Sequence, residues 1–168
     1  KGSLYHYFPA GKAAIDAAAV RAAGKGAAAT LQQLAAGSAN AGVLVKRYCR
    51  LVEGWMAKSG FRDGSPIATT LLEMAPENEA IRQAGAEAFA AWAGVLEARL
   101  LQDGIAPARA RRLAQLAIAA IEGALLQVRV ERSGKPLADA AAELAAMFAQ
   151  AVEAQGAQTG RRRRLPAA

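Results

Sequence analysis

Alanine dominates this chain and restricts the folds open to it. Alanine occupies 46 of the 168 positions, whereas aromatic residues make up only 5%. Alanine has the highest intrinsic helix propensity, and the β-branched and aromatic residues that strands favour are sparse. The sequence therefore predicts an all-α fold in which small side chains let helices pack closely, and its length suits a single domain of ordinary size.

Glycine and proline divide the chain into helical segments. Runs of helical periodicity between these residues predict helices over about 12–36, 41–59, 67–74, 76–101, 107–133 and 137–154. Gly24 and Gly26 predict a bend in the first of them, and Gly156 predicts the end of the last. The opening residues 1–8 read as a helix already in progress, closed by Pro9 and Gly11, so the chain is expected to lack its natural beginning.

The chain has the features of a cytoplasmic protein. Its one cysteine, Cys49, allows no internal disulfide, no secretory signal is visible, and no apolar run approaches the roughly 18 residues that cross a bilayer. Four of the net +7 charges come from Arg161 to Arg164, which follow a glycine-containing stretch. Residues 157–168 are therefore predicted to be a disordered basic tail, with a non-specific DNA-touching arm as the alternative.

The N-terminal motif carries a family resemblance. The run KGSLYHYF, followed by PAGKAAI, resembles the end of the DNA-reading helix-turn-helix of TetR-family repressors. The resemblance implies a TetR-like helical bundle in three parts: residues 1–12 end the DNA-binding domain, 13–156 bind ligand and dimerise, and 157–168 form the tail. It also implies a double-stranded DNA operator as partner. The residues expected at bases, groove floor or phosphates are Lys1, Gly2, Ser3, Tyr5, His6, Tyr7 and Lys12.

Two further segments refine the resemblance. Gly64, Ser65, Pro66, Ile67 and Ala68 match a segment of the subgroup related to lincomycin- and flavonoid-responsive repressors, with Ser65 at the usual cysteine position. The run Glu122 to Leu125 is similar to the same subgroup. This subgroup implies that a small hydrophobic or aromatic effector binds among the helices.

The large side chains of the middle segments are the candidates for an effector pocket. Phe89, Trp92 and Leu96 share one helical stripe, and methionines suit an adaptable cavity wall. A plain core is the alternative interpretation of the same residues. The predicted effector-binding residues are Trp55, Met56, Phe61, Leu71, Met74, Phe89, Trp92 and Leu96.

The last two predicted helices each carry an apolar face rich in small residues. They could complete the core of one chain, or pair with a second copy into a four-helix bundle, as the family resemblance implies. A homodimer would present two DNA-reading helices to a palindromic operator. The predicted dimerisation residues are Leu113, Leu116, Ala117, Ala120, Ile121, Ala124, Leu144 and Phe148.

Charged residues in apolar surroundings suggest ion pairing rather than catalysis. Glu73, Glu122 and Arg129 lie within or beside apolar stretches, and a structural ion pair or simple exposure is favoured over effector contact. The chain shows no metal-ligand spacing, phosphate-binding glycine loop or His–nucleophile pair, so no cofactor, metal or enzymatic activity is expected. The alternative to a ligand-controlled repressor is a helical small-molecule binding protein without a DNA role.

Overall fold

The computed structural model describes residues 11–163, with side chains up to residue 157, and that part of the chain is built of helices without strands. The confirmed all-α architecture consists of α2 (Lys12–Ala36), α3 (Ala41–Lys58), α4 (Ala68–Met74), α5 (Glu79–Gln102), α6 (Pro107–Glu131) and α7 (Lys135–Arg163). The predicted N-terminal helical remnant, and with it Lys1 to Tyr7, lies outside the described residues.

Helix ends follow local sequence signals. The Asn40 side chain accepts a hydrogen bond of 2.9 Å from the Val43 N–H and so caps α3. Asn78 caps α5 in the same way, at 3.1 Å from the Ile81 N–H. Pro107 occupies the first turn of α6, where its missing N–H has no cost. These caps explain why the sequence located most helix starts correctly.

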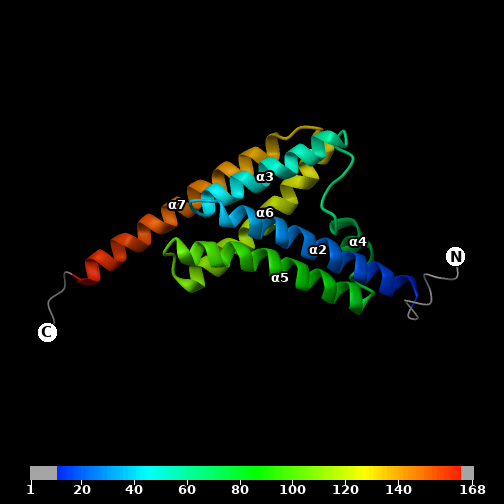
Figure 1. The fold of residues 1–168 in the computed structure, drawn as a ribbon, viewed down its shortest axis with the longest axis horizontal. Coiled ribbons are helices and arrows are strands. Elements are labelled where there is room, and N and C mark those ends of the chain that lie inside the picture. The colour runs from blue at the N-terminus through cyan, green and yellow to red at the C-terminus, as the bar shows by residue number, and fades with distance from the viewer. Residues whose placement is uncertain (1–10, 164–168) are drawn as a thin grey trace.

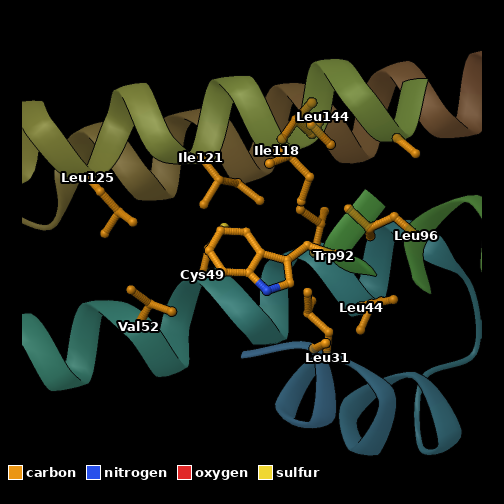
Figure 2. Packing of buried hydrophobic residues seen from close by; sticks show 14 of the residues in the cluster. Leu31, Leu44, Cys49, Val52, Trp92, Leu96, Ile118, Ile121, Leu125 and Leu144 are labelled. Atoms are coloured by element: carbon orange, nitrogen blue, oxygen red, sulfur yellow. The ribbon is translucent and has the colours of Figure 1, made fainter. Parts of the chain in front are cut away.

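Helix pairs form an elongated body (Figure 1). The helix α2 runs along α5, α3 runs along α7, and α6 contacts both α5 and α7. The core lies where these pairs meet. Figure 2 shows Trp92 of α5 at its centre, surrounded by Leu31 of α2, Cys49 of α3 and Ile121 of α6.

The contact between α2 and α5 is closest at Gly24. A Cβ atom added to Gly24 would lie 2.6 Å from the Cβ of Ala88, so no larger residue fits without moving a helix. The predicted bend at Gly24 and Gly26 is not a break, because α2 continues through both positions as one helix. Gly24 thus serves close packing, and Gly26 faces open space.

These two glycines give a matched pair of substitutions. We expect Gly24→Ala to lower the free energy of unfolding by about 1–3 kcal/mol, because its methyl group overpacks the α2–α5 contact. Gly26→Ala should instead raise it by about 0.5–1 kcal/mol, because alanine favours the helix and its methyl group meets nothing. Urea unfolding followed by circular dichroism measures both. Equal effects of the two substitutions would contradict the close-approach role of Gly24.

A polar cluster fastens the turn between α2 and α3 to the end of α5. The Arg99 guanidinium pairs with Asp103 at 2.8 Å and donates to the Ser38 carbonyl at 3.1 Å. Asp103 in turn accepts a hydrogen bond of 2.6 Å from the Ala41 N–H at the start of α3. Because backbone groups of the turn are satisfied by α5, the turn is held in place relative to the core.

The last helix is longer than predicted. The expected end at Gly156 is wrong, since α7 continues to Arg163, so the proposed boundary at residue 157 falls inside a helix. The described side chains from Val152 to Ala154 are exposed, and this end of α7 projects from the body in Figure 1. The surrounding alanines and glutamines are good helix formers and outweigh one glycine.

The helix α6 is apolar on more than one side. By length and composition alone it could cross a membrane, although Glu122 and Arg129 interrupt its apolar run. One such helix is weak evidence for a membrane span, because the core helix of a soluble protein meets the same criteria. In this structure nine of its residues are buried against the rest of the chain.

Candidate effector cavity

A cavity of about 560 Å³ opens between the middle helices and the loop that joins α3 to α4. We call it the central cavity. Its buried floor comes from α3, α5 and α6, and its exposed mouth comes largely from the loop. The lining residues are Ala27, Tyr48, Val52, Trp55, Arg62, Asp63, Gly64, Ser65, Pro66, Thr69, Trp92, Glu122, Leu125 and Arg129.

Trp92 joins the floor of the central cavity to α2. Its indole ring is only 3% exposed and makes an edge-on contact with Phe89, with ring centroids 5.4 Å apart. Its Nε1–H donates a hydrogen bond of 2.8 Å to the carbonyl oxygen of Gly24. Movement of the Trp92 ring therefore disturbs a buried bond to α2, beside the closest contact between α2 and α5.

Short-range hydrogen bonds shape the mouth of the cavity. The Phe61 N–H donates to the Met56 carbonyl at 2.7 Å, while Phe61 itself adopts a left-handed backbone conformation with φ of 60°. The Ser59 hydroxyl accepts from the Asp63 N–H at 3.1 Å, which holds the loop against the end of α3. Ile67, fully buried, anchors the far end of the loop in the core.

Glu122 places a carboxyl group on the cavity wall. Burial raises its pKa above the ordinary value, and the neighbouring Ser65 hydroxyl lowers it by a smaller amount. The Ser65 oxygen is buried and makes no hydrogen bond of regular geometry within the described part of the chain. On α3, burial together with the negative charge of Glu122 raises the pKa of Tyr48 to about 12. Tyr48 therefore stays protonated as a hydrogen-bond donor at physiological pH.

A second hollow, which we call the outer groove, lies on the other side of Glu122. Its volume is about 470 Å³ and it is bounded by α5 and α6. Its lining is mostly apolar and comprises Ala86, Phe89, Ala90, Ala93, Gln115, Ile118, Ala119 and Glu122. Glu122 thus borders both hollows.

The structure separates the predicted effector residues into three groups. Trp55 and Trp92 line the central cavity, and Phe89 lines the outer groove. Met56 and Leu96 are buried in the core and line neither hollow, so the plain-core alternative describes them better. The remaining three, which are partly buried and pack against the core outside these hollows, are Phe61, Leu71 and Met74.

Of the two favoured alternatives, an ion pair or exposure, the structure shows exposure for Arg129 and no ion pair for Glu122 among the described residues. Both side chains line the central cavity, but the ion pairs among the described residues involve other partners. Glu73 is exposed, which agrees with the predicted alternative of simple exposure. A lone acid inside an apolar run was the signal that could have placed Glu122 in the site. Ser65 was identified only through its position in the subgroup segment, and no sequence signal pointed to Tyr48; the fold brings both beside Glu122.

Most of the predicted dimerisation residues are unavailable to a partner in this structure. Only Leu116, with 47% exposure, and the half-buried Ala120 have surface to offer. The six that pack inside the core of the single chain are Leu113, Ala117, Ile121, Ala124, Leu144 and Phe148. The opposite side of α6 carries an exposed row at helical spacing, the outer stripe, formed by Leu116, Ala119, Gly123, Leu126 and Val130.

Comparison with known proteins decides the family. The profile of the LmrA/YxaF-like transcriptional regulators, C-terminal domain, matches residues 43–143. An HTH-type transcriptional regulator of Mycobacterium tuberculosis is 35% identical to this chain, over 82% of this chain and 71% of its own length. The chain belongs to the TetR family of transcriptional regulators. The TetR resemblance carried by residues 1–12 is thereby confirmed.

Two Bacillus subtilis relatives agree with the lincomycin-related subgroup. The HTH-type regulators YxaF and LmrA are 27% and 26% identical, each over 82% of this chain and over 72% and 73% of their own lengths. This TetR-family chain is therefore a DNA-binding transcriptional regulator, and such regulators are generally not enzymes. Among the described residues no group of three or more His, Cys, Asp or Glu could hold a metal ion.

Proposed function

We propose that this TetR-family protein is a cytoplasmic repressor whose affinity for its operator is controlled by a small hydrophobic effector in the central cavity. The observation that carries the proposal is the Trp92–Gly24 hydrogen bond of 2.8 Å. Trp92 lines the cavity, and Gly24 belongs to α2, which starts at Lys12 directly after the DNA-reading motif. A ligand against Trp92 therefore acts on the helix that leads to the reader.

The proposed control is a shift between two arrangements of α2 relative to α5. A ligand that binds one arrangement more tightly increases its population, and the gain equals the difference in binding free energy. If the favoured arrangement changes the spacing of the two DNA-reading helices in a dimer, ligand binding lowers operator affinity. By linkage, operator binding lowers ligand affinity by the same factor. The exposure of Lys12 in the first turn of α2 supports the proposal, because a basic side chain and the N–H groups of a helix N-terminus both suit a DNA phosphate.

A homodimer through the outer stripe completes the proposal. The helix α6 has a second apolar side, the outer stripe, and only its inner side is covered within one chain. Ala119 and Gly123 at the middle of the stripe permit close approach of two α6 helices, flanked by Leu116 and Leu126. A two-fold pair suits a palindromic operator, and TetR-family regulators act as dimers.

An unbiased effector screen on the full-length gene product tests the proposal. The operator is first selected from random duplex DNA, and compounds that raise the melting temperature are then added to the complex in a mobility-shift assay. We expect at least one stabilising compound to release DNA from the wild-type protein. Failure to select any duplex, or stabilising ligands that leave DNA affinity unchanged, would contradict a ligand-controlled repressor and favour a binding protein without a DNA role.

A further inference from the structure

Glu122 is a carboxyl group that no ion pair neutralises in the part of the chain that the structure describes. It lies at the junction of the central cavity and the outer groove, half-buried on α6. None of the ion pairs among the described residues includes it. The cavity's two arginines, Arg62 and Arg129, are exposed at the mouth, and Arg129 is two helical turns from Glu122 along α6. Among the residues with described side chains, 11–157, the carboxyl therefore has no close counter-charge.

An unpaired buried carboxylate is costly, and the cost is visible in this site. Moving a carboxylate out of water is unfavourable unless a cation or hydrogen-bond donors replace the lost hydration. Burial raises the pKa of Glu122 accordingly. A cationic ligand bound next to Glu122 would offset this cost. The cavity therefore favours a positively charged ligand more than a cavity lined only by neutral residues would.

The neighbouring side chains suit a flat cation. Tyr48, Trp55 and Trp92 line the same cavity, and their ring faces attract positive charge. Trp55 is 48% exposed at the mouth and Trp92 is buried at the floor, so a planar ligand entering the cavity passes along both rings. The volume of about 560 Å³ lies within the range of pockets for drug-sized molecules.

We propose that the effector is a flat aromatic molecule with a positively charged nitrogen, and that Glu122 pairs with this nitrogen. The inference rests on the proposed effector role of the central cavity and specifies its ligand class. An acidic effector is disfavoured because it would bring a second negative charge next to Glu122. The exposed arginines at the mouth are screened by water and salt and compensate little of that repulsion.

The test compares three ring systems of nearly equal shape on the full-length protein at pH 8. N-methylacridinium is a permanent cation, acridine is neutral at this pH, and anthracene-9-carboxylate is an anion. By calorimetry we expect the cation to bind at least about tenfold more tightly than acridine, which corresponds to one close charge pair in a partly buried site. The anion should bind most weakly of the three.

Two glutamine substitutions distinguish the effect of the Glu122 carboxylate from the effect of the protein's net charge. Glu122→Gln should reduce the preference for N-methylacridinium over acridine to about onefold, since the pairing carboxylate is gone. Glu131→Gln makes the same change of charge at an exposed position of α6 outside both hollows and should keep the preference. Melting curves of both variants confirm that they are folded.

The pH dependence gives a second readout. The cation requires the ionised carboxyl, so its affinity should fall as pH drops through the raised pKa of Glu122, and this fall should be absent in Glu122→Gln. The other charged or titratable groups around Glu122 are Tyr48 and Cys49 of α3, both with pKa raised to about 12, the loop residues Arg62 and Asp63, and Arg129. The lining residues from α2 and α5 are alanines, Phe89 and Trp92, which do not titrate.

The outcomes distinguish this inference from the proposed function. Equal affinity for cation and neutral ring, tighter binding of the anion, or an unchanged preference in Glu122→Gln would each overturn the cationic class. If acridine binds and releases the operator without a charge preference, the cavity remains the effector site and only the ligand class fails. If none of the three compounds binds, the proposed cationic ligand class is wrong as well. The proposed function is then tested only by the effector screen.

Discussion

Leu126→Arg is expected to separate the proposed dimer into folded monomers. Leu126 is 64% exposed in the outer stripe, so the single chain loses little stability when it is replaced. In a two-fold pair the substitution places two arginines, one from each copy, in an apolar contact, where their unpaired charges together cost at least about 2.7 kcal/mol. We expect the dimer dissociation constant to rise at least about 100-fold, as measured by analytical ultracentrifugation, and operator binding to fall with it.

Leu72→Arg is the matched control for this prediction. Leu72 is 78% exposed on α4 and lies outside the outer stripe, so the same chemical change there should leave the dimer intact. Dimers that persist in Leu126→Arg, or dissociation of both variants alike, would show that the outer stripe is not the contact between copies.

Trp92→Ala is expected to cause the largest loss of stability of any single truncation in the cavity. Trp92 is 3% exposed, packs edge-on against Phe89 and donates to the Gly24 carbonyl. Truncation of a buried aromatic ring removes its contacts and leaves a void, which lowers the free energy of unfolding by about 3–5 kcal/mol. Urea unfolding followed by circular dichroism measures the loss without relying on tryptophan fluorescence.

Trp55→Ala separates stability from ligand binding in the same cavity. The Trp55 ring is 48% exposed at the mouth, so its removal should lower the free energy of unfolding by under about 1 kcal/mol. Its loss should still weaken a flat ligand, because one stacking surface is gone. Similar destabilisation by both tryptophan substitutions would contradict the assignment of Trp92 to the floor and Trp55 to the mouth.

The helices were largely predictable because their limits are set locally. Asn40 and Pro107 are at the expected starts of α3 and α6, whereas Asn78 caps α5 so that this helix begins at Glu79, three residues after the predicted start at 76. The end of α7 was not predictable from Gly156, since a single glycine lowers helix propensity by an amount that neighbouring alanines offset. The family was predictable from a short motif, because residues 1–12 combine aromatic, hydroxyl and basic side chains in a specific order.

The faces of α6 show where sequence periodicity stops being informative. Ile121 and Leu126 are both apolar, yet the first is in the core and the second is exposed. A helix with two apolar sides gives no single amphipathic direction, so the sequence could not decide which side faces a partner. The predicted dimerisation residues therefore fell mainly on the inner side.

The cavity was only partly predictable for a related reason. Large aromatic residues pointed to Trp55 and Trp92 correctly, but the wall is completed by Tyr48, Ser65 and Glu122 from three separate segments. Only the tertiary fold brings these segments together. Glu122 was noticed as an acid among apolar residues, but the sequence could not show that its position on α6 borders a cavity, so an ion pair or exposure was favoured over an effector contact.

The coupling between the central cavity and α2 is tested most directly with Trp92→Phe, which keeps an aromatic ring but removes the donor to Gly24. The measurement is operator affinity of the full-length protein with and without a saturating effector from the screen. We predict that effector weakens operator binding of the wild-type protein at least about tenfold, within the usual range of allosteric coupling, and that Trp92→Phe, still folded and still binding effector, loses most of this response. An undiminished response in Trp92→Phe would contradict transmission through this bond.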